Sequence, residues 1–248
     1  MSQPLPLQDQ VAIVTGAGRG IGRAIALAYA QAGAAVACAA RTADDLNSLV
    51  AEIQQSGGTA FALPTDVTQR PAVDDLVDQT IATYGGLDIL VINAGGNFDR
   101  RPIETSVADE WQATFDLNLN AAYHCAQAAL PHLKQRGGGK IIVLGSGLGH
   151  HGRANMAAYS CSKAALWMFT RVLAQEVWGF GISVNELIPG PVDTSLARQS
   201  ARQTDSVFNI DSEWIKGPED VVPLALFMAT QPALGPTAQS FSLMRRDT

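Results

Sequence analysis

Short, continuously apolar segments recur along this chain and alternate with longer segments whose apolar residues follow a helical period. The apolar segments predict buried strands, because strands covered on both faces are apolar at nearly every position. The expected strands lie at residues 11–15, 36–40, 60–63, 88–92, 140–144 and 182–188, with a short last strand at 241–243. The longer segments predict helices at 23–32, 44–55, 71–84, 108–136, 157–178 and 218–230.

The alternation of buried strands with helices determines the expected fold class. Parallel strands need a crossover connection, and a crossover helix packs on one face of the sheet. Right-handed crossovers then give a doubly wound, Rossmann-type parallel β-sheet with helices on both faces. No linker rich in proline, serine or charge divides the 248 residues, so we expect a single α/β domain over residues 1–248.

Composition and charge narrow the function classes. The chain carries 17 Lys and Arg residues against 23 Asp and Glu, a net charge of −6, and the basic residues are dispersed. A nucleic-acid-binding surface is therefore not expected. The first ten residues lack the basic and apolar parts of a signal peptide, and no apolar run reaches membrane-spanning length. We expect a cytoplasmic protein without a membrane partner.

The cysteines indicate neither disulfides nor a metal site. Cys38, Cys125 and Cys161 are widely spaced, odd in number and mostly set among apolar residues. None of them has a Cys or His at zinc-ligand spacing. We expect reduced, buried thiols and no metal ion.

A glycine-rich loop joins the first expected strand to the first expected helix. Gly16, Gly18, Gly20 and Gly22 lie in it. Small residues let the backbone approach a pyrophosphate, and a helix N-terminus offers free N–H groups and the positive end of its dipole. The spacing differs from the usual G-x-G-x-x-G pattern, and an ordinary tight turn is the alternative. The position between strand and helix favours nucleotide binding.

The end of the second expected strand should meet the adenosine ribose of a bound dinucleotide. NAD-binding proteins often carry an acidic residue there, which binds the ribose 2′-hydroxyl. This strand ends without a carboxylate and is followed by Arg41, while Arg19 lies in the glycine loop. Two guanidinium groups suit a 2′-phosphate, so we favour NADP(H) over NAD(H) as the cofactor. The alternative is that Arg41 is a solvated turn residue or stacks on the adenine of either cofactor.

Polar residues also follow the third and fourth expected strands, whose carboxyl ends belong to the ligand-binding edge of an open α/β sheet. Asp66 follows the third strand and is placed to accept from an adenine amino group; helix capping is the alternative. The fourth strand is followed by Asn93, Ala94, Gly95 and Gly96, for which plain turn chemistry is the alternative to cofactor binding.

The segment from Ser146 to Lys163 carries the candidate chemistry. Ser146 follows the fifth strand, and Tyr159 and Lys163 are four residues apart in the next helix. That spacing places both side chains on one helical face. An ammonium beside a phenol stabilises the phenolate, so we expect the Tyr159 pKa to fall from about 10 toward neutrality. Tyr159 would then act as a general acid or base, whereas a lone Tyr-x-x-x-Lys is more often a surface helix.

Taken together, the motifs resemble the short-chain dehydrogenase/reductase family. The resemblance covers roughly residues 9–230 and rests on Thr15-Gly16-x-x-x-Gly20-Ile21-Gly22, Asn93-Ala94-Gly95, Asn118, Ser146, Tyr159-x-x-x-Lys163 and Pro189-Gly190-Pro191-Val192-x-Thr194. The motifs follow the family order, and Ser146 precedes Tyr159 by thirteen residues, as in the family. The resemblance implies a nicotinamide cofactor and the interconversion of a carbonyl and an alcohol on a small-molecule substrate.

The resemblance also implies roles for the matching residues. It implies that Tyr159 is the catalytic acid/base, and that Lys163 lowers its pKa and binds the nicotinamide ribose. Ser146 would hold the substrate oxygen, and Asn118 would anchor a water of the proton relay. Arg19 and Arg41 match positions where basic residues accompany NADP preference. The cofactor-binding set implied by the resemblance is Gly16, Arg19, Gly20, Ile21, Gly22, Arg41, Asp66, Val67, Asn93, Ala94, Gly95, Tyr159, Lys163, Pro189, Gly190, Val192 and Thr194.

The substrate pocket is expected to draw on loops near these residues. Its polar and partly basic character favours a small polar substrate, such as a sugar, a polyol or an anionic oxo or hydroxy compound. Solvated loop residues or interface contacts are the alternative. The candidates are Asn97, Phe98, Arg100, Arg101, His150, His151, Arg153 and Asn155, with a lid over residues 195–214.

The C-terminal segment departs from the family pattern, in which a last strand is usually followed by a Gly-rich tail. Residues 235–248 contain no such tail. In relatives this region often lies at a subunit interface, so the departure bears on the homo-oligomer, a tetramer or dimer, that the resemblance implies.

Three rival functions stand beside this interpretation. The first is an NAD(H)-dependent enzyme that acts on a hydrophobic ketone or a 3-oxoacyl compound. The second is a dinucleotide-binding protein without catalysis, against which the intact Ser146, Tyr159 and Lys163 argue. The third is a serine hydrolase, but its nucleophile elbow needs Gly-x-Ser-x-Gly, and Leu144 and Leu148 occupy both glycine positions around Ser146.

Overall fold

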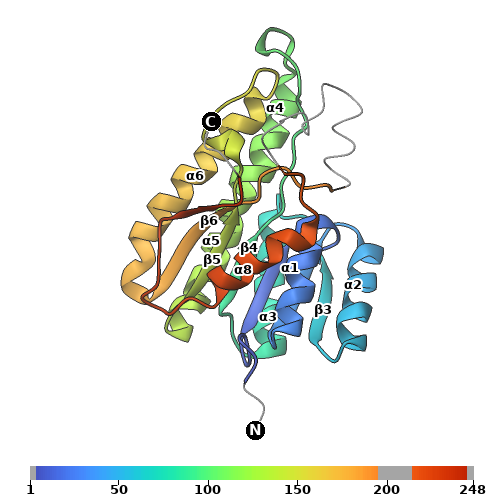
Figure 1. Cartoon of the computed structure of the whole chain (residues 1–248), viewed down its shortest axis with the longest axis vertical. Coiled ribbons are helices and arrows are strands. Elements are labelled where there is room, and N and C mark those ends of the chain that lie inside the picture. Colours follow the sequence, from blue (N-terminus) through green and yellow to red (C-terminus); the bar gives the residue numbers. More distant parts are fainter. Residues whose placement is uncertain (1–3, 195–213, 245–248) are drawn as a thin grey trace.

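The computed structural model describes residues 4–194 and 214–244 (Figure 1). Within these residues the chain forms a parallel seven-stranded sheet in the order β3-β2-β1-β4-β5-β6-β7. The doubly wound α/β fold class expected from the sequence is confirmed. The strands are β1 Val11–Thr15, β2 Ala35–Ala40, β3 Thr59–Pro64, β4 Ile89–Ile92, β5 Gly139–Leu144, β6 Ile182–Ile188 and β7 Ser240–Ser242.

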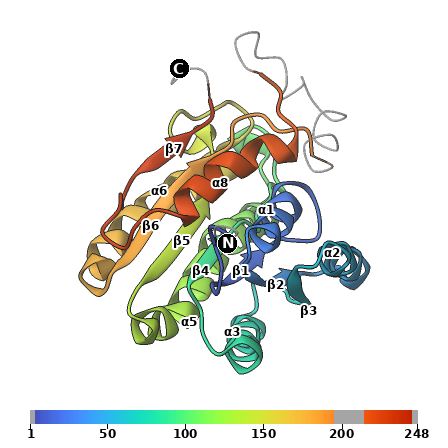
Figure 2. The same ribbon diagram turned by 60° about the horizontal axis from the view of Figure 1, so that its bottom comes forward.

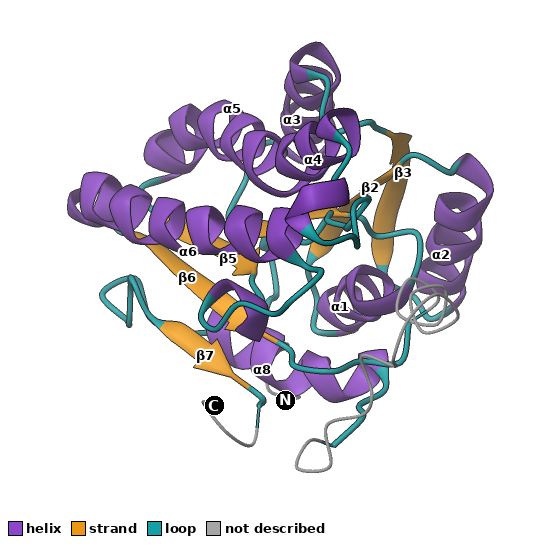
Figure 3. Cartoon of the chain, turned by 90° about the horizontal axis from the view of Figure 1, so that it is seen from above, coloured by secondary structure: helices purple, strands orange, loops and turns teal. Residues whose placement is uncertain are grey.

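Helices cover both faces of the sheet (Figure 3). Side chains of successive strand residues point to opposite faces, so alternate residues of β1, β5 and β6 enter two separate apolar cores. One core includes α1, α2 and α8, and the other includes α3, α5 and α6. The helices are α1 Gly20–Gln31, α2 Ala43–Gln55, α3 Arg70–Tyr84, α4 Ala108–Phe115, α5 Ala121–Arg136, α6 Ala157–Val177 and α8 Val222–Ala229.

The order of the strands reverses between β1 and β4, which lie side by side in the middle of the sheet (Figure 2). The chain moves outward through β2 and β3 and then returns to add β4, β5 and β6 on the other side of β1. At the carboxyl ends of β1 and β4, the loops that follow the two strands therefore diverge and leave a crevice. Open α/β sheets bind their ligands in such a crevice.

One helix prediction was wrong in its continuity. The expected helix over residues 108–136 is interrupted by a π-helical turn, Asp116–Asn120, between α4 and α5. Asn118 in this turn is buried, and its side chain bonds to the loop after β4 and to α6. A π turn inserts one extra residue into a helix and is often found at functional sites. The helix continues past Pro131 and ends at Gly137, whose φ of 90° is left-handed.

The cysteine prediction holds for two of the three thiols. Cys38 and Cys125 are buried, and burial raises the pKa of each to about 12. Cys161 is exposed on α6, contrary to the expectation, because its position on the helix faces away from the sheet. None of the helices in the described part of the chain has the length and apolar character needed to span a bilayer.

Candidate active site

The glycine loop after β1 leads directly into α1, as the sequence predicts. Arg19 is the N-cap residue of α1, and its side chain makes no capping hydrogen bond. The first turn of α1 contains no acidic residue that could stand in for an anion. The N–H groups at this helix end are thus left without a side-chain acceptor, and they fit the pyrophosphate of a dinucleotide.

Two glycines of the loop are required by close packing against Asn93. A Cβ on Gly22 would lie 2.4 Å from Asn93 Nδ2 and equally close to the Gly16 carbonyl oxygen. Gly16 has a φ of +66°, and a Cβ there would lie 2.7 Å from the same amide nitrogen. The Asn93 amide in turn donates to the carbonyls of Thr15 (2.8 Å) and Gly16 (3.2 Å). Asn93 therefore holds the glycine loop in place from β4.

Thr15 completes this link, a role that sequence reasoning missed. Its Oγ1 accepts from the backbone N–H groups of Asn93 (3.0 Å) and Ala94 (3.2 Å) and lies 3.2 Å from the Val91 carbonyl, to which it donates. The ends of β1 and β4 are thereby joined at the crevice. The signal in the sequence was a hydroxyl at the last position of an otherwise apolar strand.

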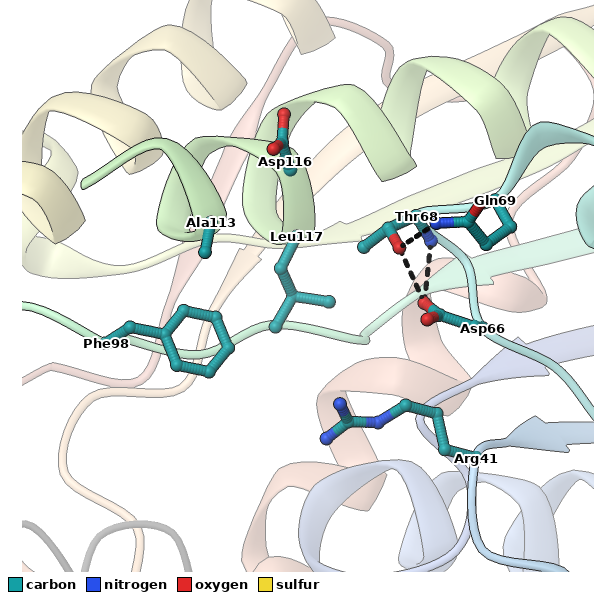
Figure 4. A pocket seen from close by; sticks show the side chains of 8 residues that line it. All are labelled: Arg41, Asp66, Thr68, Gln69, Phe98, Ala113, Asp116 and Leu117. Atoms are coloured by element: carbon teal, nitrogen blue, oxygen red, sulfur yellow. Dashed lines mark hydrogen bonds between the residues drawn. The ribbon is translucent and has the colours of Figure 1, made fainter. Parts of the chain in front are cut away.

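A pocket opens beside the ends of β2 and β3 (Figure 4). Asp66 and Arg41 face it, and Asp66 Oδ1 accepts from the backbone N–H (3.0 Å) and hydroxyl (2.8 Å) of Thr68. The aspartate therefore forms a turn with Thr68, while α3 starts after Gln69. Apolar groups on the opposite wall suit the face of an adenine ring. The lining residues are Arg41, Asp66, Thr68, Gln69, Phe98, Ala113, Asp116 and Leu117.

The arginines near this pocket differ in their surroundings. Arg19 and Arg41 are exposed and form no ion pair within the described part of the chain. Arg23, one turn into α1, is instead held by Glu52 at 2.6 Å. Arg19 and Arg41 thus remain available to an anionic ligand, whereas Arg23 is already neutralised.

Ser146, Tyr159 and Lys163 come together at the carboxyl end of β5. Tyr159 and Lys163 lie on one face of α6, and the Lys163 Nζ is 5.9 Å from the centroid of the Tyr159 ring. The Ser146 hydroxyl interacts with the Tyr159 hydroxyl and acts to lower the Tyr159 pKa. Lys163 is 4% exposed, and its Nζ donates to the Leu144 carbonyl at 2.7 Å.

The expected fall of the Tyr159 pKa was wrong for the protein chain by itself. Burial raises the pKa of Tyr159, although the hydrogen bond from Ser146 and the charge of Arg100 act in the opposite direction. Lys163 directs its ammonium to a backbone carbonyl instead of the phenol, so it does not offset the burial. Burial also lowers the pKa of Lys163 to about 8.

Asn118 connects three parts of the site. Its Oδ1 accepts from the Gly96 N–H (2.9 Å), and its Nδ2 donates to the Gly96 carbonyl (2.8 Å) and to Ser162 Oγ (2.9 Å). A Cβ on Gly95 would lie 3.0 Å from the same Oδ1 and 3.5 Å from Lys163 Nζ. The π turn therefore ties the loop after β4 to the helix that carries Tyr159 and Lys163.

The segment after β6 lies beside the glycine loop. A Cβ on Gly20 would lie 3.1 Å from Thr194 Cγ2, and Val192 is buried and bridges to Lys216. Gly190 has a φ of +67° and packs against Met244. The structure thus brings Pro189–Thr194 to the same crevice as Gly16–Gly22 and Asn93–Gly95. The expected lid residues 195–213 lie outside the described residues, and Trp214 is exposed.

Arg100 and Arg101, both expected to line the substrate pocket, interact with different parts of the protein. Arg101 bonds to Asp99 (Nε to Oδ1, 2.9 Å) and to Glu110, so it braces the loop after β4, and its assignment to the pocket was wrong. Burial alone would raise the pKa of Asp99, but hydrogen bonds from Ser106, Arg101 and the Val107 amide lower it to about 2. Arg100 interacts electrostatically with Tyr159, and burial lowers the pKa of its guanidinium.

The other pocket candidates are dispersed. Asn97 donates to Met156 Sδ at 3.4 Å, and Phe98 lines the pocket beside Arg41. Arg153 and Asn155 are exposed. His150 Nε2 lies 3.0 Å from a carboxylate oxygen of Glu186, a buried residue of β6 that sequence reasoning missed. The signal was an acidic residue inside a segment expected to be a buried strand.

Known proteins are similar to this chain in both sequence and fold. The family model described as "short chain dehydrogenase" matches residues 10–205. The chain belongs to the short-chain dehydrogenase/reductase family. The membership confirms the resemblance of the motifs, and it supports an NAD(P)-dependent oxidoreductase that acts on CH–OH or C=O groups of small molecules.

Individual members of the short-chain dehydrogenase/reductase family match over nearly the whole chain. An uncharacterized oxidoreductase of Staphylococcus aureus (strain MRSA252) is 34% identical over 226 residues, 91% of this chain and 93% of the relative. The short-chain reductase protein NovJ of Streptomyces niveus is 36% identical over 231 residues, 90% and 87% of the two chains.

Solved structures of the family share the whole fold. A short-chain type dehydrogenase/reductase from Mycobacterium marinum has a TM-score of 0.90 and 34% identity, with 97% of this chain and 96% of that chain covered. A 7α-hydroxysteroid dehydrogenase in complex with NADH and 7-oxo glycochenodeoxycholic acid has a TM-score of 0.89 and 31% identity, with 98% and 97% covered.

Proposed function

We propose that this chain, as a single cytoplasmic domain, is an NADP(H)-dependent oxidoreductase that interconverts a carbonyl and an alcohol on a small anionic substrate. Tyr159 is the acid/base, and Ser146 holds the reacting oxygen. The observation that carries the proposal is the convergence of Ser146, Tyr159 and Lys163 at the carboxyl end of β5, beside the loops after β1, β4 and β6.

The residues of the chain supply the proton and stabilise charge. The nicotinamide cofactor, when bound, supplies or accepts the hydride. Tyr159 donates a proton to the carbonyl oxygen in reduction, and Ser146 hydrogen-bonds that oxygen as negative charge develops on it. Lys163 lies on the same face of α6 as Tyr159 and binds the Leu144 carbonyl at the end of β5, while Asn118 keeps the Gly95–Gly96 loop and α6 at a fixed separation. Glycine packing against Asn93 supports the cofactor loop.

The preference for NADP(H) is supported by two arginines at the adenosine end that form no ion pair with the described residues. Arg41 lines the pocket with Asp66 (Figure 4), and Arg19 is the N-cap residue of α1, at the end of the glycine loop. Guanidinium groups bind phosphate oxygens through paired hydrogen bonds, which are stronger than hydrogen bonds between neutral groups.

We expect Arg41→Ala to raise KM for NADP by about tenfold and to leave KM for NAD nearly unchanged, since one charge-assisted hydrogen bond contributes about 1.5–3 kcal/mol. Initial rates with both cofactors measure this. Arg23→Ala is the matched control, because it removes a cation from the same region that Glu52 already neutralises. Equal changes for both cofactors in Arg41→Ala would contradict the 2′-phosphate assignment.

An anionic substrate is supported by Arg100. Its electrostatic interaction with Tyr159 places a cation near the phenol that transfers the proton. A carboxylate or other anion on the substrate would meet this charge within the site.

The function is tested by initial rates of cofactor turnover over neutral polyols, anionic oxo and hydroxy acids, and hydrophobic ketones. We expect the highest kcat/KM for an anionic compound with NADP(H), and about a tenfold higher KM for it in Arg100→Ala. Arg153→Ala, at an exposed position, is the control and should leave KM unchanged. A best substrate without charge, or an unchanged KM in Arg100→Ala, would refute the anionic specificity.

A second candidate function is an NAD(H)-dependent enzyme for a hydrophobic ketone. It is favoured by the solved relative that holds NADH and a 7-oxo bile acid, and by Phe98, Ala113 and Leu117 in the pocket wall. Turnover of hydrophobic ketones with NAD(H) in the same panel would select it. Turnover of any member of the panel would exclude a purely cofactor-binding protein.

A homo-oligomer, either a dimer or a tetramer, is part of the proposal. Tyr123 on α5 and Met168 and Val172 on α6 are exposed apolar residues, at 46%, 49% and 46%. Met168 and Val172 lie four residues apart, on one face of α6. Such a face is suited to burial against another subunit.

A further inference from the structure

Glu186 is a buried carboxylate in β6, and all the remaining residues of this strand are buried as well. It is 1% exposed. It shares its face of the strand with Ile182 and Val184, which belong to the core that includes α6. A carboxylate in such a place is costly unless neighbouring groups compensate it. The surroundings of Glu186 therefore need a physical account.

The two oxygens of Glu186 have different surroundings. Oε2 accepts from Ser240 Oγ on β7 at 2.5 Å and lies 3.0 Å from His150 Nε2. Oε1 is buried and has no hydrogen-bond partner within the described part of the chain. A Cβ on Gly145 would lie 1.9 Å from Oε1, so the carboxylate occupies the space that a side chain before Ser146 would fill.

The turn that follows Ser146 is packed between Glu186 and α6. It is a 3₁₀ turn, Gly147–Gly149, and Ser146 Oγ accepts from the Leu148 N–H at 3.2 Å. His150 ends the turn, and its ring lies tilted against that of Trp167 on α6, with centroids 5.1 Å apart. A Cβ on Gly149 would lie 2.8 Å from the backbone of Lys163. The contact of His150 with Glu186 thus restrains the turn that begins at Ser146.

Glu186 also acts on Lys163 through space. Lys163 donates to the carbonyl of Leu144, the residue before Gly145. Burial lowers the pKa of Lys163 to about 8, and the charge of Glu186 opposes this fall. Among the described residues, the titratable groups that face Lys163 are Glu186 from β6 and Tyr159 from its own helix; those that face Glu186 are Lys163 and His150.

We propose that Glu186 is a positioning residue: its carboxylate, packed against Gly145 beside the Leu144 carbonyl that binds Lys163, is the counter-charge of that lysine, and its contact with His150 holds the turn that carries Ser146. The inference rests on the proposed roles of Ser146, Tyr159 and Lys163 and adds a residue that acts through them without touching substrate or cofactor. It assigns two separate effects to one carboxylate, a charge effect on Lys163 and a contact effect on the turn.

The two effects can be separated by substitution. Glu186→Gln removes the charge with little change of shape. His150→Phe removes the ring nitrogen that contacts Glu186, keeps an aromatic ring beside Trp167 and leaves the charge. Ser240→Ala is the matched control, since it removes another contact to Oε2 while both the charge and His150 stay. Glu186→Ala removes the same charge without an amide beside Gly145, and it replaces Glu186→Gln should that variant fail to fold.

The ionisation of Lys163 is measured by NMR of protein labelled with ε-¹³C lysine, which contains Lys134, Lys140, Lys163 and Lys216. Lys163→Arg assigns the signal. We expect Lys163 to titrate about one pH unit lower in Glu186→Gln than in the natural protein, because an adjacent opposite charge shifts a pKa by about 1–3 units. His150→Phe and Ser240→Ala should leave the Lys163 titration unchanged.

Steady-state rates provide the second readout. In the reduction direction, the alkaline limb of kcat should move to lower pH in Glu186→Gln by the same amount as the Lys163 titration, because neutral Lys163 holds the Leu144 carbonyl without a charge-assisted hydrogen bond. His150→Phe should lower kcat about 2–10-fold with no shift of the limb, as expected for one lost hydrogen bond.

Unchanged Lys163 ionisation in both Glu186→Gln and Glu186→Ala would overturn the charge effect. Full kcat in His150→Phe would overturn the contact effect. The NMR titration does not depend on turnover, so its outcome stays distinct from the proposed function. That function would fail separately, through an inactive natural protein or an active Tyr159→Phe variant.

Discussion

Tyr159→Phe is expected to slow turnover by about 10²–10⁴-fold, the range typical of lost general acid–base catalysis, while the cofactor still binds. Phenylalanine retains the ring and its packing on α6 but removes the hydroxyl to which Ser146 bonds. The loss should therefore fall on kcat, with little change in KM. Initial rates with the best substrate of the panel, together with fluorescence titration of the cofactor, measure the two parts.

A matched control and a pH profile sharpen this expectation. Tyr123→Phe removes a hydroxyl from an exposed tyrosine on α5 and should leave kcat unchanged. Because burial raises the Tyr159 pKa, the phenol is protonated at neutral pH and ready to donate a proton in reduction. Oxidation of the alcohol needs the ionised form, so its rate should rise toward alkaline pH. A flat oxidation profile with chemistry rate-limiting, or near-normal kcat in Tyr159→Phe, would contradict the assignment.

Gly22→Ala is expected to lower the free energy of unfolding by about 2–3 kcal/mol, as overpacking of a tight contact does. For a chain of this size that corresponds to a fall in Tm of about 4–12 °C. The added methyl would lie 2.4 Å from both Asn93 Nδ2 and the Gly16 carbonyl oxygen, so the glycine loop and β4 must separate. Cofactor binding should be lost together with stability. Thermal unfolding and cofactor titration measure both.

Gly179→Ala is the matched control for this substitution. No atom lies within 4 Å of a Cβ placed on Gly179, and its φ is not left-handed. We expect its Tm and cofactor affinity to equal those of the natural protein within error. A Gly22→Ala variant with normal Tm and normal cofactor affinity would show that Asn93 does not hold the loop as the structure indicates.

The sequence predicted the fold well because the fold depends on short-range pattern. Each expected strand is present, since parallel strands buried on both faces must be apolar at nearly every position. The end of α5 at Gly137 follows from local backbone chemistry as well. The break at Asp116–Asn120 was not predicted, because it depends on where Asn118 meets Gly96 and Ser162 across the crevice.

The candidate site was predicted where its residues form linear motifs. Tyr159 and Lys163 share a helical face because of their spacing, and the glycine loop precedes α1 as expected. Arg101 was misassigned because its partner Glu110 lies nine residues ahead, on α4. The spacing of Tyr159 and Lys163 also suggested a lowered Tyr159 pKa. In the structure burial raises this pKa, and Lys163 donates to the Leu144 carbonyl and not to the phenol.

The sequence by itself determined the fold class, the order of the elements and the residue types available for proton transfer and phosphate binding. These properties follow from hydrophobic period, turn chemistry and spacing along one element. Only the tertiary structure decided which charges meet and how far each is removed from water. Glu186 meets His150 across 36 residues of chain, and from β6 it acts on Lys163 of α6. Electrostatic effects depend on distance and burial, which a linear pattern does not encode.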